Sequence, residues 1–417
     1  MKRLVSLGAI LLLAAEVLAA CGSAPTGGGA ATTSAPPTGG ATTAPAAGGG
    51  EPITIGGGFN LTGGLAALEV PAANGAKLAV KEINAAGGVL GRPLDLKILD
   101  GKSDTTTVGN ITTQLIDSEK SIALIGFTDS DSALAAGPIA LKANIPFITV
   151  GATSPNLPSQ IGRNTFLACF GDNVQAAAGA EFAYDKLKAK TTYLLWNKGT
   201  EYTRLLGNYF KQRWTELAGA DSLLGEDTYQ KEDTDFSAQI TKIKGLPKQP
   251  DFLYISAYPD EIGSVVKQMR AAGVTLPIVG GDGYDTPQLV EIAGPQAANK
   301  VYFSTHSLVD PTNAAEPVKK FIAAYKQEYN TDPENAFAAL GYDTVYLLAD
   351  AIKRANGTDS AAVITALEQT KGFPGITGQL NFSADSHVPQ KGVTIIEIKD
   401  GKFTLGAEIV PQKVPAP

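Results

Sequence analysis

The sequence predicts an α/β fold built from parallel sheets in two lobes. Short apolar segments alternate with helical patterns of about ten to fifteen residues through most of the chain, which is typical of repeated βαβ units. Residues 122–125 are apolar throughout, and 252–256 are apolar up to the serine at the end, as expected of strands covered by helices on both faces. The chain from about Glu51 onward is too long for one hydrophobic core, so we expect two lobes.

The first two-thirds of the folded part consist of regularly alternating elements. Residues 53–55 start a strand, and a helical run over 74–85 gathers its apolar residues on one face before Gly87 and Gly88 end it. Further strands are expected at 94–99, 122–125, 145–150, 165–170, 192–196, 252–256 and 277–279, and further helices at 105–118, 133–143, 175–188, 204–218 and 261–272.

The C-terminal part has a different pattern. Helical patterns at 317–329, 336–355 and 361–368 follow one another, and antiparallel strands are expected at 378–382, 392–399 and 403–410, with a turn at Asp400-Gly401. A chain that adds late helices and hairpins can cross between lobes several times. Because ligands of open parallel sheets bind beyond the carboxyl ends of the strands, the loops after strands are the places to look for a site.

The N-terminus predicts export. Lys2 and Arg3 precede a short apolar run over 4–15, and the segment ends in Leu18-Ala19-Ala20-Cys21. We expect residues 1–20 to be a signal peptide, and the small residues before Cys21 resemble the lipobox of bacterial lipoproteins, whose cysteine is acylated. The alternative is an ordinary cleaved signal with an incidental cysteine.

The segment 21–51 predicts a tether. Residues 22–50 are almost entirely Gly, Ala, Thr, Ser and Pro, so they cannot bury enough apolar surface to fold. A flexible linker of roughly thirty residues has a root-mean-square reach of about 30 Å. We therefore expect a folded body held near, but not on, a membrane surface.

Composition excludes several classes of protein. A net charge of −7 without a basic cluster argues against nucleic-acid binding. There are two cysteines, so if Cys21 carries lipid no disulfide can form, and Cys169 is expected to be a small buried strand residue. His306 and His387 are the two histidines, and the sequence has no metal-ligand spacing, nucleophile elbow or P-loop. We therefore expect neither catalysis nor a cofactor.

Two loops after strands are rich in small and hydroxyl residues. The loop 126–132 opens a helix, and the loop 151–154 reads Gly-Ala-Thr-Ser. Backbone N–H groups and hydroxyls at a helix start can hold a carboxylate or a phosphate, although plain helix capping explains either loop as well. Asp129 and Asp131 would repel an anion in the first loop.

Two other strand ends carry acidic and aromatic residues. Residues 256–261 include Tyr258, and Asp282 lies between glycines in residues 280–284. Glycines clear space around an acidic group, so Asp282 could approach a ligand cation closely. The alternatives are a turn aspartate that binds its own backbone and a tyrosine that serves only in packing.

An ordered series of segments resembles the leucine/isoleucine/valine-binding proteins, the substrate-binding components of branched-chain amino-acid ABC importers. The most distinctive segment runs from Gly75 to Pro93 and reads GAKLAVKEINAAGGVLGRP. The other matching segments, in order, are Asp104, 138–140, 145–155, 235–243, 280–283 and 336–342.

This resemblance implies a type I periplasmic-binding fold, which is two doubly wound parallel-sheet lobes joined by three crossovers. The expected first lobe is 52–170 plus 303–371, and the expected second lobe is 171–302 plus 372–410. The lobes would close on a small zwitterion, an aliphatic amino acid, and a monomer would deliver it to ABC permease and ATPase subunits. Relatives of this fold that sense a ligand without transport, or that bind amides, urea or aromatic acids, remain open alternatives.

The resemblance also implies a set of ligand-binding residues. The ligand carboxylate would be held by one loop hydroxyl and by the backbone and hydroxyl groups of a second loop, and the ammonium by an acidic side chain and a tyrosine. A second tyrosine and a phenylalanine would line the cleft. In that order, these residues are Ser130; Gly151, Ala152 and Thr153; Asp282 and Tyr258; and Tyr202 and Phe337.

Overall fold

The computed structural model describes residues 50–231 and 233–417. The expected signal peptide, Cys21 and nearly all of the expected linker lie outside these residues. No helix in the described part of the chain is both long and apolar enough to cross a bilayer.

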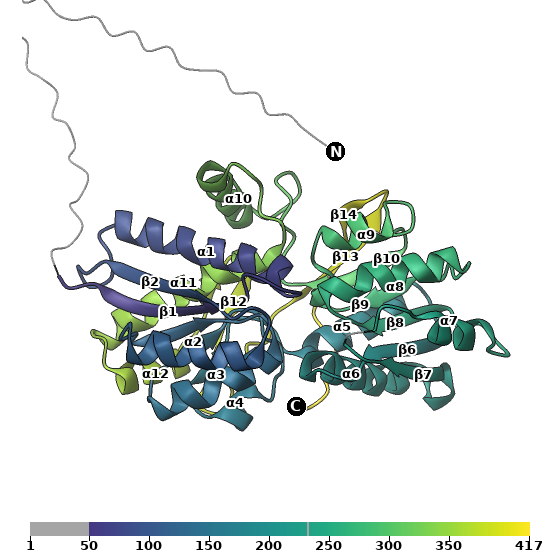
Figure 1. The fold of residues 1–417 in the computed structure, drawn as a ribbon, viewed down its shortest axis with the longest axis horizontal. Coiled ribbons are helices and arrows are strands. Elements are labelled where there is room, and N and C mark those ends of the chain that lie inside the picture. The colour runs from purple at the N-terminus through teal and green to yellow at the C-terminus, as the bar shows by residue number, and fades with distance from the viewer. Residues whose placement is uncertain (1–49, 232) are drawn as a thin grey trace, which may run out of the picture. The chain divides into compact units, whose positions relative to one another are not determined.

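The first lobe is built on a five-stranded parallel sheet. Its N-terminal elements are β1 (Ile53–Phe59), α1 (Ala66–Ala85), β2 (Leu94–Asp100), α2 (Thr105–Asp117), β3 (Ala123–Gly126), α3 (Ser130–Lys142), β4 (Phe147–Thr149), α4 (Leu157–Ile161) and β5 (Thr165–Leu167). The strand order is β2-β1-β3-β4-β5. Later in the chain, this lobe receives α10 (Glu316–Tyr329), α11 (Ala336–Ala355), α12 (Ser360–Glu368), β11 (Phe373–Gly375) and β12 (Gly378–Leu380). Helices α1 and α11 pack together on one face of the sheet, and α2 and α3 cover the other (Figure 1).

The second lobe is built on a seven-stranded mixed sheet. Its elements are α5 (Asp172–Asp185), β6 (Thr192–Asn197), α6 (Glu201–Ala218), η1 (Ala220–Ser222), β7 (Leu223–Tyr229), α7 (Ser237–Lys244), β8 (Phe252–Ser256), α8 (Pro259–Ala271), β9 (Ile278–Gly280), η2 (Asp282–Tyr284), α9 (Gln288–Ala293), β10 (Val301–Thr305), β13 (Val393–Lys399) and β14 (Lys402–Ile409). The strand order is β14-β13-β10-β9-β8-β6-β7, and β13 runs antiparallel to both of its neighbours.

The described chain passes between the lobes three times, as the fold class predicts. The first passage follows β5. The second follows Thr305, because β10 pairs with β9 and β13, whereas we expected it at 302/303. The third lies between β12 and β13, because Leu380 and Phe382 belong to the core of the first lobe, whereas we expected it at 371/372. The sequence pattern did not predict β10 as a strand, and the expected boundary at 302/303 divided its residues between the two lobes.

Helix α1 begins at Ala66, not near position 74, and it continues through Pro71. A proline has no backbone N–H, so the carbonyl of Ala67 loses its partner within the helix. Asn335, the N-cap residue of α11, fills this gap by donating its Nδ2 hydrogen to the Ala67 carbonyl at 2.9 Å. A long-range contact thus makes the first turns of α1 stable, and local sequence does not reveal it.

Two glycines let α1 and α11 approach closely. A Cβ atom on Gly75 would lie 1.8 Å from the carbonyl oxygen of Ala338, and one on Gly341 would lie 2.0 Å from that of Ala72. No larger residue fits at either position. This contact fixes the helix that carries Phe337 onto the body of the first lobe.

The edge of the second sheet also departs from expectation. Strand β7 and helix α7 were not predicted. Strand β7 lies at the edge of the sheet, most of its residues are only half-buried, and several of them are polar, so it lacks the apolar pattern of a central strand. The hairpin of β13 and β14 is confirmed. Asp400 and Gly401 have φ angles of 49° and 76°, and two positive φ values define the tight turn that suits paired strands.

Candidate ligand-binding site

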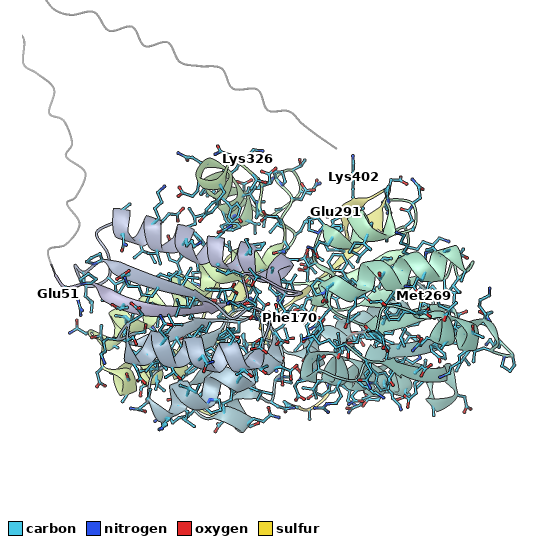
Figure 2. The ribbon with its side chains drawn as sticks, in the orientation of Figure 1. Glu51, Phe170, Met269, Glu291, Lys326 and Lys402 are labelled. Atoms are coloured by element: carbon cyan, nitrogen blue, oxygen red, sulfur yellow. The ribbon has the colours of Figure 1, made fainter. Side chains whose placement is uncertain are left out.

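All eight residues expected to bind ligand are buried where the two lobes meet. Six of them lie between the ends of β3, β4, β8 and β9 and the first residues of the elements that follow, and the helices α6 and α11 supply the other two. Figure 2 shows Phe170, in the first passage between lobes, at this junction. A continuous series of short contacts connects the eight residues.

One end of the site is made by the loops after β3 and β4. Asp129 is the N-cap residue of α3, so Ser130 is the first residue of that helix. The Ser130 Oγ accepts a hydrogen bond from the Ser154 N–H at 3.2 Å, which ties the two loops together. Among the described residues, the backbone N–H groups of Ala152 and Thr153 have no protein acceptor, and the buried Ser154 Oγ has no partner. Unused donors therefore gather here, next to a helix N-terminus that favours negative charge.

Phe337 covers this end of the site. The side chain of Asn335 caps α11 by accepting a hydrogen bond from the Phe337 N–H at 3.1 Å. The phenyl ring lies so close to Gly151 that a Cβ there would be 2.6 Å from the ring Cε1. Gly151 therefore serves to admit the aromatic ring.

The other end of the site is acidic. Asp282 accepts a hydrogen bond from the Gln175 Nε2 at 3.0 Å on one oxygen, and its other oxygen lies 3.0 Å from the His306 Nε2. These partners differ from the backbone self-contact that we considered for a turn aspartate. Burial lowers the pKa of His306 despite the opposing effect of Asp282. The imidazole is thus neutral at pH 7, and its Nε2–H donates to the carboxylate.

Two aromatic rings hold His306. Its ring stacks on Phe170 with centroids 3.9 Å apart and meets the edge of Phe337 at 5.5 Å. Its Nδ1 is buried and has no hydrogen-bond partner in the part of the chain that the structure describes. The His306 Nε2 therefore binds Asp282, and the Nδ1 remains available as a hydrogen-bond acceptor.

The two cleft tyrosines have different partners. The Tyr202 hydroxyl accepts a hydrogen bond from the Gly283 N–H at 3.0 Å and so fixes the loop of Asp282. The Tyr258 hydroxyl donates across the lobes to Asp129, and the two tyrosine rings are 5.3 Å apart. Because Tyr258 gives its hydrogen to Asp129, its oxygen can still accept one from a ligand.

A second hydrogen bond links the lobes beside Tyr258. The Glu201 N–H donates to Asp131 at 3.1 Å. Burial and then the neighbouring Asp129 raise the pKa of Asp131 to about 6. Asp129 and Asp131, whose charges would repel an anion, thus form hydrogen bonds between the two lobes.

Sequence reasoning missed three residues of this site, namely Asp172, Gln175 and His306. Asp172 and Gln175 start α5 directly after the first passage between lobes, and His306 follows β10. The rule that sites lie beyond strand ends could have found the first two. The third followed a strand that had not been recognised.

Cys169 is fully buried, as expected, but it lies just beyond β5 rather than in a strand. Its Sγ contacts the Ala152 carbonyl at 3.4 Å, and burial raises the pKa of its thiol. Among residues 50–231 and 233–417, no group of three or more His, Cys, Asp or Glu side chains could hold a metal ion.

The fold and the buried site between lobes define a two-lobe ligand-binding protein. Residues 52–402 match the periplasmic binding protein family, so this chain belongs to that family. The leucine-binding protein LivK of Thermotoga maritima superposes with a TM-score of 0.79 at 34% identity, covering 86% of this chain and 99% of that one. The predicted resemblance to leucine/isoleucine/valine-binding proteins is confirmed.

Two further solved structures are similar. LivJ of Streptococcus pneumoniae, a branched-chain amino-acid transporter substrate-binding protein in complex with isoleucine, has a TM-score of 0.78 at 33% identity, with 86% of this chain and 99% of that one covered. An ABC-transporter solute-binding protein from R. palustris in complex with benzoate has a TM-score of 0.74 at 25% identity, with 87% and 98% covered.

Proposed function

We propose that this protein is the substrate-binding component of an ABC importer and that it captures an aliphatic amino acid outside the cytoplasmic membrane. The observation that carries the proposal is the polarity of the buried site. Among the described residues, unused donors lie at one end, namely the N–H groups of Ala152 and Thr153. Unused acceptors, the Asp172 Oδ2 and the His306 Nδ1, lie beside Asp282 at the other end. A free amino acid has the complementary pair of charges.

The binding mode follows from this arrangement. The Ser130 hydroxyl and the backbone N–H groups of Ala152 and Thr153 bind the carboxylate, and Asp282 with the Tyr258 oxygen binds the ammonium. Phe337 and Tyr202 line the space for the side chain. No bond is made or broken, so the protein acts by closing its lobes on the ligand and presenting the closed form to the permease.

An aromatic acid is the main competing ligand, because a relative binds benzoate. An aromatic acid lacks an ammonium group, so the buried carboxylate of Asp282 would have no positive charge to pair with. Leaving a buried charge without a partner costs several kcal/mol. We therefore expect amino acids to bind more tightly than aromatic acids, amides or urea.

A thermal-shift panel tests the ligand class. The intact chain, purified in mild detergent, is heated with single amino acids, amides, urea and aromatic acids. A ligand at 100 times its Kd adds about 2.7 kcal/mol to the free energy of unfolding, which raises the melting temperature visibly. A response limited to aliphatic amino acids supports the proposal. A response limited to aromatic acids, amides or urea contradicts it.

Transport and sensing share this binding step, so a second experiment separates them. Deleting the gene should abolish uptake of the labelled ligand if the protein serves an importer. Unchanged uptake together with a lost transcriptional response would instead indicate a sensor.

We further propose that Cys21 is acylated and anchors the mature chain as a monomer beside its permease. The basis is the sequence Leu18-Ala19-Ala20-Cys21 and the uncharged segment after it. Cys21→Ser should remove labelling by a palmitate analogue and release the protein from the membrane fraction. Persistent labelling would refute acylation at Cys21.

A further inference from the structure

We propose that Asp172 carries a proton before the ligand binds and that the ligand's ammonium displaces it, so that binding releases a proton to the solvent. This inference rests on the proposed function, because it requires a ligand that carries a positive charge. It also adds Asp172 to the residues that recognise the ligand.

The amide of Gln175 joins the two carboxylates. Its Nε2 lies 3.0 Å from an oxygen of Asp172 and 3.0 Å from an oxygen of Asp282, so each amide hydrogen serves one carboxylate. Its Oε1 accepts hydrogen bonds from the Asp282 N–H at 3.1 Å and from the Ser304 hydroxyl at 2.7 Å. The amide is fully used and cannot rotate to pair one acid at the expense of the other.

Among the described residues, one carboxyl oxygen of Asp172 has no hydrogen-bond partner, although the Thr153 side chain lies near enough to this carboxyl group to lower its pKa. The side chain of Asp172 is fully buried, and the oxygen without a partner is its Oδ2. Its backbone N–H donates to the Thr153 carbonyl at 2.7 Å, which places Asp172 between the two ends of the site. An ionised oxygen left alone in this way costs more free energy than a neutral, protonated carboxyl group does.

The surroundings of the pair offer no strong positive charge. Burial and then Asp282 raise the pKa of Asp172 well above its usual value, against weaker effects of Thr153 and Gln175. The titratable groups around the pair are Glu201, Tyr202, Tyr209, Tyr254, Cys169, Asp285, His306 and Lys391. The cationic group among them, Lys391, donates to the Ala168 carbonyl and the Thr377 hydroxyl, and the carboxyl group with the largest effect on its pKa is Asp343.

A ligand ammonium changes this balance. It brings one positive charge and three donors, which can serve Asp282 and the unpartnered Oδ2 of Asp172 together. Asp172 then ionises, and its proton leaves to water. The expected release is about one proton per ligand at any pH at which Asp172 is protonated before binding.

Isothermal titration calorimetry tests the inference. Leucine, or the amino acid that responds best in the panel, is titrated into the intact chain at pH 7 in three buffers with different ionisation enthalpies. We expect the observed heat to change with buffer enthalpy by about one proton released per site. Binding with heats that do not depend on the buffer would overturn this inference and leave the proposed function intact. Absence of binding by every amino acid would overturn the proposed function and the inference with it.

Two variants locate the proton. Asp172→Asn mimics the protonated acid and should bind with little or no proton release. Asp285→Asn removes another buried acid, one that binds the Thr305 hydroxyl and the Ala336 N–H instead of Gln175, and it should keep the release. Loss of release in Asp285→Asn but not in Asp172→Asn would overturn the assignment.

The wild-type protein provides an independent measurement if Asp172→Asn does not fold. Its affinity should rise with pH, by up to about tenfold per pH unit, over the range in which Asp172 holds its proton before binding. An affinity that is constant between pH 5 and pH 8 would refute the proton exchange.

Discussion

Replacing Asp282 with asparagine removes the negative charge of the acidic end and keeps its shape. In the wild-type protein, Asp282 is 2% exposed and accepts from Gln175 and His306. The asparagine oxygen can keep one of these bonds. The other can be restored if His306 changes tautomer and accepts from the new amide through its Nε2. We therefore expect the variant to fold with nearly unchanged stability.

The loss of affinity should be large. Removing one partner of a buried charge pair costs about 2–5 kcal/mol of binding free energy. Asp172 remains nearby and can still accept from an ammonium, which places the expected loss toward the lower half of that range, at about 3 kcal/mol. Since about 1.4 kcal/mol corresponds to a factor of ten, the Kd should rise roughly 100-fold.

Calorimetric titration of wild type, Asp282→Asn and Asp282→Glu with the same amino acid makes the comparison. The glutamate variant keeps the charge and should lose less affinity than the asparagine variant. An unchanged Kd in Asp282→Asn would refute the assignment of Asp282 to the ammonium. Equal losses in both variants would show that shape, not charge, is what the site needs.

Three further perturbations test the scaffold. Arg213→Met should lower the free energy of unfolding by about 3 kcal/mol in urea titrations without changing ligand affinity, because it leaves the buried Glu181, 2.7 Å away, without its cation; an unchanged stability would contradict this. Gly75→Ala should cost about 1–3 kcal/mol by separating α1 from α11, while Gly357→Ala, with no atom near its added Cβ, should change stability by less than about 0.5 kcal/mol; equal effects would argue against the close helix contact. Burial raises the pKa of Asp285 to about 6, so its contribution to folding is fully present below the usual carboxyl pKa and is lost as pH rises through 6. Asp285→Asn should therefore flatten melting temperature against pH between 4 and 7, and an unaltered profile would contradict the shift.

The sequence predicted the fold class, the lobes and most of the elements, because alternating apolar strands and amphipathic helices are local patterns. It could not predict elements whose stability comes from distant residues. The first turns of α1 need Asn335, and β7 is a half-polar edge strand that pairs only with β6. Because β10 was not predicted as a strand, His306, which directly follows it, was not recognised as a residue at a strand end.

For the site, too, the sequence predicted what depends on local pattern and not what depends on contacts between distant segments. The eight residues expected from the resemblance lie together and buried, although their roles toward a ligand stay predictions. Gln175 and His306, the partners of Asp282, come from segments 107 and 24 residues away in the chain. A sequence pattern can identify a residue type at a strand end, but the hydrogen bonds between strand ends form only after the sheets are ordered.

The proline in α1 has a practical consequence for anyone who wants a sturdier version of this scaffold. Pro71→Ala would restore the helix's own hydrogen bond to Ala67 and so compete with Asn335 for that carbonyl. Asn335 also begins the helix that carries Phe337 over Gly151. A gain in heat resistance at this position would thus come with a displaced pocket wall, the familiar trade-off between stability and activity. Thermostabilised biosensors built on this chain should keep the proline and seek their gains on surfaces far from the cleft.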